Sequence, residues 1–261
     1  MGSVGWNAGA ESTAMTPDMA AAAVAQLAER VEAAWTTDQR TLHRARELRL
    51  SAWAFAVAGR GGVLGDDVDA ETVVAALGLI APDALRAGWE AAGRVGPAAV
   101  AFARLAECAA WGQRQLSGAV DGQLVELLDR VVTDADATAM PIFAATRRLI
   151  RTTDVEGDGA RVALALHALS EFRHAALLLG SRAVGLEPVE LLIAGPEGEQ
   201  EALTFGWTPP FPSRLSVLRR YALATALADR MMGQALAGLS AAERTDLVNR
   251  LTATARAAEP S

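Results

Sequence analysis

The chain contains no lysine. All 24 of its basic residues are arginine, and 31 acidic residues give it a net charge of −7. Proteins whose main task is to bind DNA usually carry a basic surface, because neutralised phosphates supply most of the affinity. The charge balance therefore makes DNA an unfavoured partner, although a local basic face of Arg86, Arg94 and Arg104 would still allow a regulator.

Cysteine is also scarce. The single Cys108 excludes an intramolecular disulfide and is typical of a reducing compartment, so we expect a cytoplasmic protein. Because Cys108 lies in an alanine-rich segment, we expect a buried and unreactive thiol. No apolar run approaches the roughly 18 residues of a membrane span, and we expect no membrane partner. Residues 1–15 lack the basic start and apolar core of a signal peptide, so we interpret them as a disordered tail.

The motifs of the common enzymes are missing too. The segment from Gly59 to Gly62 lacks the Lys-Ser/Thr pair that completes a phosphate-binding loop. No serine nucleophile elbow, zinc-ligand spacing or kinase signature occurs in the sequence. These absences exclude the common hydrolases and leave unusual enzymes open.

What the sequence does contain is alanine, the best helix former. Helix starts such as Thr16-Pro17-Asp18 and the capping box that begins at Ser240 alternate with glycine stops. The pattern predicts an all-α fold of about eleven helices in a single domain over residues 16–261. Two pseudo-repeat halves, 16–120 and 121–261, are an alternative arrangement of the same helices.

Two short turns resemble the turn of a helix-turn-helix unit. One runs from Gly78 to Pro82, and the other from Gly185 to Pro188. The turn at 195–198 predicts a small β-hairpin whose second arm reaches Trp207. Together these features indicate helix-turn-helix-like elements in a tandem, winged-helix-like arrangement.

The segment from Phe55 to Trp207 resembles an actinobacterial family of helical proteins labelled SalK-like, often filed under a helix-turn-helix heading. The abundance of alanine and arginine agrees with such a source. The residues that carry the resemblance are Gly59-Arg60 before Leu64-Gly65, Val74 to Leu79 with Pro82 and Trp89, Leu169 to Arg173, Gly185-Leu186, and Gly206 to Thr208. The family's Leu-Arg-Glu-His-Arg-Gly-Asp-Gly-His run aligns with Leu169 to Leu177 here. Glu171 and Arg173 match that run, whereas Phe172, His174 and Leu177 depart from it, so no role of the family's histidines is carried over.

Two of the three histidines lie close together in one predicted helix. His167, Glu171 and His174 are spaced four and three residues apart, which places them on one helical face. Two imidazoles and a carboxylate on one face suit general acid–base catalysis, or a metal site of the 2-His-1-carboxylate kind. No fourth protein ligand is evident, so we expect no metal cofactor and keep these residues as the weak metal candidate.

Three further residues are candidates for ligand binding. Arg60 lies between glycines, where its guanidinium could hold a carboxylate or phosphate through two hydrogen bonds. Arg173 is two residues from Glu171 and points away from it on a helix, so the two residues should have separate partners. Trp207 begins a stiff aromatic and proline-rich segment that could cover a pocket.

These residues lead to three hypotheses. The first is a protein of secondary metabolism that binds or transforms a small organic ligand in an apolar helical pocket. If it is an enzyme, His167 or His174 would be the acid or base. The second is a ligand-responsive helix-turn-helix regulator, and the third is a helical interaction module without a ligand. A homodimer is compatible with each of them.

Overall fold

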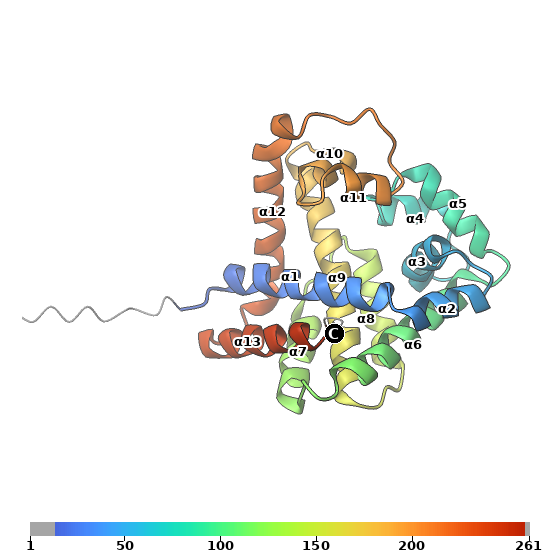
Figure 1. Ribbon diagram of the computed structural model, residues 1–261. Coiled ribbons are helices and arrows are strands. Elements are labelled where there is room, and N and C mark those ends of the chain that lie inside the picture. The colour runs from blue at the N-terminus through green and yellow to red at the C-terminus, as the bar shows by residue number, and fades with distance from the viewer. Residues whose placement is uncertain (1–13, 259–261) are drawn as a thin grey trace, which may run out of the picture.

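The computed structural model describes residues 14–258, and all of the regular structure within them is helical (Figure 1). Residues 1–13 of the predicted tail lie outside this range. The thirteen α-helices and one 3-10 helix of the described residues are α1 (Pro17–Thr36), α2 (Gln39–Glu47), α3 (Ala52–Gly61), η1 (Gly62–Leu64), α4 (Ala70–Ala76), α5 (Pro82–Ala92), α6 (Pro97–Leu116), α7 (Gly122–Asp134), α8 (Pro141–Thr152), α9 (Asp158–Ala183), α10 (Pro188–Ala194), α11 (Glu199–Thr204), α12 (Arg214–Leu236) and α13 (Ala241–Ala257). The all-α prediction is confirmed.

Two of these α-helices were not predicted. A single helix was expected from about residue 38 to 58, but Arg49 adopts a left-handed φ of 56° and ends the first half. Ser51 then caps α3 by accepting a hydrogen bond from the Ala54 amide at 3.1 Å. The hairpin predicted after the turn at 195–198 is replaced by α11, in which the Phe205 amide bonds to the Glu201 carbonyl at 2.9 Å.

Helix α9 occupies the centre of the molecule (Figure 1). It packs against α1, α6, α7, α8 and α12, so helices from both ends of the chain surround it. By length and composition α9 could cross a membrane, but 72% of its apolar window is buried inside the fold. Its apolar character is therefore accounted for by its position in the core.

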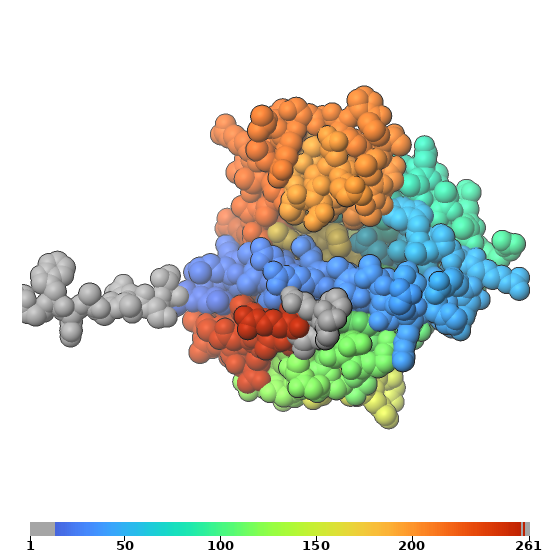
Figure 2. Space-filling view, in the orientation of Figure 1, coloured from blue at the N-terminus to red at the C-terminus, as the bar shows by residue number. Residues whose placement is uncertain are grey.

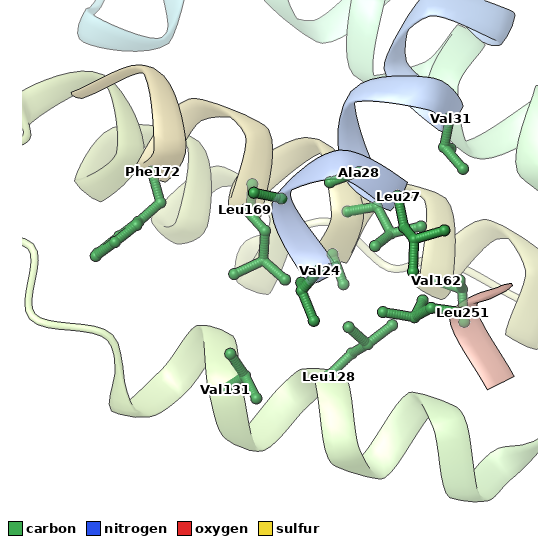
Figure 3. Close-up of a cluster of buried hydrophobic side chains, with 14 of the residues drawn as sticks. Val24, Leu27, Ala28, Val31, Leu128, Val131, Val162, Leu169, Phe172 and Leu251 are labelled. Carbon is green, nitrogen blue, oxygen red and sulfur yellow. The ribbon is translucent and has the colours of Figure 1, made fainter. Parts of the chain in front are cut away.

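The largest hydrophobic core gathers side chains of α1, α7 and α9 (Figure 3). Val24 and Ala28 of α1 and Leu128 of α7 are each no more than 1% exposed. Phe172 of α9 meets Phe143 edge to face, with ring centroids 5.0 Å apart. Cys108 is buried beside this core, as predicted, and its burial raises the pKa of the thiol.

The first predicted helix-turn-helix element exists as two short helices, α4 and α5, joined by residues 77–81. The second differs from the prediction, because the helix before Gly185 is α9, which has 26 residues. The two short helices α10 and α11 both follow Gly185, so this turn does not lie between two short helices. The two pseudo-repeat halves stay a prediction.

Candidate functional site

A line of polar groups runs through the interior beside α9. Arg60 of α3 donates two hydrogen bonds to Glu171, from Nε to Oε1 at 2.7 Å and from Nη2 to Oε2 at 2.8 Å. Burial alone would raise the pKa of Glu171, but the charge and hydrogen bonds of Arg60 outweigh it and hold that pKa at about 2. Glu171 is therefore a charged structural partner of Arg60 at neutral pH.

A second cluster joins α1, α6 and α9. Glu32 of α1 accepts hydrogen bonds from Nη2 of Arg104 at 2.7 Å, Nδ1 of His167 at 2.9 Å and Nε1 of Trp35 at 2.9 Å. The Arg104 guanidinium also stacks on the Trp35 ring, 4.3 Å from its centroid. Burial would raise the pKa of Glu32, yet the positive groups around it hold that pKa well below its usual range. His167 is thus engaged by Glu32, away from any open cavity.

The three residues of the weak metal candidate, His167, Glu171 and His174, do not share a partner in the structure. Glu171 faces Arg60 and His167 faces Glu32. Within residues 14–258, no group of three or more His, Cys, Asp or Glu side chains is placed to hold a metal ion. His174 borders the same small void as Arg60 and Glu171, and burial with the positive charge of Arg60 lowers its pKa to about 4. Its imidazole is neutral at physiological pH.

An open cleft of about 640 Å³ lies between α1, the segment from α10 to α11, and α12, with α9 beneath it. Figure 2 shows the hollow between α1, in blue, and the orange segment of α10 and α11. We call it the α1–α10 cleft. Its walls contain a group of apolar and aromatic side chains: Ala25, Leu177, Leu191, Leu192, Phe205 and Tyr221.

Buried polar groups without partners concentrate in this cleft. Among the described residues, five buried side-chain nitrogen or oxygen atoms make no hydrogen bond. Three of these atoms belong to residues that line the cleft: Nε of Arg173, Nδ1 of His174 and Oγ1 of Thr225. Arg173 uses Nη1 to hold Asp229 of α12 at 2.6 Å, which leaves Nε free. A second hollow of about 540 Å³ beside α6 is lined by none of the five residues.

Three carboxyl groups line the cleft, one from α1 and two from the segment of α10 and α11. Glu29 of α1 and Glu197 are exposed at its rim, and Glu201 of α11 is half-buried. Partial burial, with the negative charges of Glu29 and Glu197, raises the pKa of Glu201 to about 7. Glu201 is therefore close to half-protonated at neutral pH.

The six candidate residues thus lie in several places, and His167 belongs to the cluster around Glu32. Arg173 and His174 line the cleft, and Arg173 has a partner other than Glu171, as predicted. Arg60 and Glu171 reach only a void of about 10 Å³ behind it. Trp207 does not line the cleft, but its Nε1 donates to the Leu79 carbonyl at 2.8 Å, and Leu79 is part of the wall.

Several cleft and network residues were not predicted. The charged sequence from Glu29 to Glu32 is typical of a solvated face, yet Glu32 is the acceptor at the centre of the second cluster. The signal for Arg104 was present, because Val100, Ala101, Arg104, Leu105 and Cys108 share one apolar helical face. No local pattern marks Thr225, Asp229 or Glu201, since the fold brings them to α9 from distant parts of the chain.

The basic face required for a regulator does not form. Arg104 is 3% exposed and points into the core. Arg86 is half-buried and neutralised by Glu71 at 2.6 Å and Asp83 at 2.7 Å. Of the three arginines, Arg94 alone stays exposed without a salt bridge to a described residue.

Comparison with known proteins gives one match. A family model described as a helix-turn-helix family matches residues 20–260, almost the whole chain. No curated protein and no solved structure matches the sequence or the fold at a significant level.

Proposed function

The chain belongs to this helix-turn-helix family, and from that premise and the α1–α10 cleft we propose that it binds a small organic molecule. The observation that carries the proposal is that Arg173, His174 and Thr225, which line one cavity, each keep a buried polar atom without a partner. The proposal includes a cytoplasmic location and a role in secondary metabolism, as expected from the sequence.

The physical reason is the cost of an unsatisfied buried polar group. A buried donor or acceptor without a partner costs about 1–3 kcal/mol, so folded proteins keep few of them. Three around one apolar cavity are explained when a bound molecule supplies their partners. The volume of about 640 Å³ lies in the range of roughly 300–1,000 Å³ that small-molecule sites occupy.

The regulator is the weaker alternative for an electrostatic reason. In the α4–α5 element, the second helix exposes Asp83 and Glu90, and Arg86 is already held by acids. A DNA-reading helix needs unpaired basic groups facing the phosphates. The regulator predicts a gel shift with mixed duplex DNA at low salt that disappears steeply as salt rises. We expect no shift under these conditions, and a salt-sensitive one would favour the regulator.

If the protein were an interaction module without a ligand, its interior should be filled. The open cleft therefore favours the ligand-binding hypothesis over the interaction module. The direct test compares the native and denatured masses of freshly purified full-length protein. We expect excess mass of a small molecule in the native spectrum. The Thr225→Trp variant, which places an indole in the cleft, should lose this mass.

Ala222→Trp is the matched control, since Ala222 is exposed on the same helix and lies outside the cleft lining. It should keep the ligand. A ligand retained equally by both variants would place binding elsewhere and contradict the proposal. A bare native mass, together with no change in melting temperature on adding a panel of metabolites, would also contradict it.

A further inference from the structure

Acidic side chains outnumber basic side chains around the α1–α10 cleft. Four carboxyl groups line it, those of Glu29, Glu197, Glu201 and Asp229, against the single guanidinium of Arg173. Asp229 and Arg173 neutralise each other at 2.6 Å. The remaining three acids come from two separate segments, and none makes a side-chain hydrogen bond or salt bridge with another described residue.

Two independent features indicate that this unequal charge belongs to a binding site. The first is the cavity itself, with apolar walls beside the acids. The second is Arg173, whose side chain is 9% exposed and whose Nε has no partner although it lines the same space. A guanidinium N–H that is buried in this way needs an acceptor, and the described side chains around it supply none to that atom.

We propose that the cleft binds an organic amine, with the cationic nitrogen between Glu29, Glu197 and Glu201 and an apolar body against Leu191, Leu192 and Phe205. A polar acceptor on the same molecule meets Nε of Arg173. This inference rests on the proposed ligand-binding function and assigns the chemical class of the ligand. An anionic ligand is disfavoured because Asp229 already neutralises the positive charge of Arg173.

Protonation of Glu201 couples binding to pH. Its pKa of about 7 reflects partial burial and the charges of Glu29 and Glu197. The groups facing it across the cleft are Arg173 and neutral His174 on α9, and Asp229 and Tyr221 on α12. A bound cation favours the ionised carboxylate. Affinity for an amine therefore rises from pH 6 to pH 8, and the protein releases a proton on binding at pH 7.

The experiment uses three probes of similar shape with the full-length chain: 2-phenylethylamine, neutral 2-phenylethanol and anionic 3-phenylpropionate. Isothermal titration calorimetry or ligand-observed NMR at pH 8 should give an affinity for the amine about tenfold or more above that for the alcohol, with the anion weakest. One lost charged contact of about 1.4 kcal/mol corresponds to tenfold. Glu201→Gln should therefore weaken amine binding about tenfold and abolish its dependence on pH.

Glu199→Gln is the matched control, because Glu199 is exposed on the same helix and does not line the cleft. It should bind the amine like the wild type. Equal binding of amine and alcohol that Thr225→Trp abolishes would overturn the amine assignment and leave the ligand-binding function standing. Preferred binding of the anion would do the same. If none of the three probes binds at millimolar concentration, the amine assignment is wrong, and the native mass then decides on the ligand-binding function.

Discussion

Arg60 and Glu171 lie 111 residues apart in the sequence, and their side chains meet through two parallel hydrogen bonds of 2.7 and 2.8 Å. The two side chains are only 13% and 3% exposed. The pair ties α3 to the central helix α9. Because both charged groups are buried away from water, each needs the opposite charge of the other to offset its lost hydration.

Replacing Glu171 by Gln should therefore destabilise the protein strongly. The change leaves the Arg60 guanidinium buried without a counter-charge, which costs on the order of 3 kcal/mol. Urea unfolding measures the loss. The matched control is Asp129→Asn in the exposed pair of Asp129 with Arg161, where a loss below about 1 kcal/mol is expected. Equal losses in the two variants would contradict the structural role of the pair.

The double variant Arg60→Met with Glu171→Leu separates charge from packing. Removing both charges together leaves no buried ion uncompensated, so much of the stability lost in Glu171→Gln should return. A double variant as unstable as the single one would show that the hydrogen-bond geometry itself is required.

Stability should fall in acid, and His174 should begin the loss. Its folded pKa of about 4 lies below its ordinary 6.5, so the unfolded chain binds the proton more tightly and stability decreases as pH falls from about 6.5 to 4. Glu171, at about 2 against 4.5, continues the loss from about pH 4.5 to 2. Glu201 has a raised pKa and acts in the opposite sense between pH 4.5 and 7.

The difference between wild type and His174→Asn isolates the histidine, because Glu201 contributes to both. The wild type should lose about 2 kcal/mol more than the variant between pH 7 and pH 4.5, as measured by urea unfolding at each pH. Parallel curves for the two proteins across this range would contradict the buried, neutral state of His174.

The fold class was predictable because its signals are local. Caps such as Thr16 and Ser240, and apolar spacing along α7, act within a few residues and mark the helices directly. The break at Arg49 was missed because arginine does not usually end a helix, although Ser51 is a common N-cap residue. Helix α11 was missed because the turn at 195–198 can precede a strand as well as a short helix. The apolar composition of residues 161–179 correctly predicted a buried helix, and the spacing of His167, Glu171 and His174 placed them on one of its faces. The spacing could not reveal that Glu171 would pair with Arg60 and that His167 would pair with Glu32.

Arg104 should not tolerate lysine. Its guanidinium stacks on Trp35 and donates to Glu32 within the core, and an ammonium group cannot reproduce the flat stacking surface. We expect Arg104→Lys to cost about 2 kcal/mol, measured as a lower melting temperature. Arg114→Lys on the same helix is the control, since Arg114 lies 3.7 Å from Asp38 and is partly exposed, and its loss should be below about 1 kcal/mol. Similar melting temperatures for both variants would refute the stacked arrangement.

The close approach of α6 and α9 depends on two glycines. A Cβ atom at Gly112 would overlap the Cβ of Ala163 and the carbonyl of Gly159, so neither helix can yield without moving its backbone. Gly112→Ala should therefore destabilise the protein by about 1–3 kcal/mol, despite the higher helix propensity of alanine.

Gly122→Ala provides the comparison, because Gly122 begins α7 and a Cβ there meets no atom within 4 Å. The smaller entropy of the unfolded chain should leave this variant equal to the wild type or about 0.5 kcal/mol more stable in urea unfolding. Adding Ala163→Gly to Gly112→Ala removes one of the two overlaps and should recover part of the loss. A Gly112→Ala protein as stable as Gly122→Ala would mean that α6 and α9 lie farther apart than the structure places them.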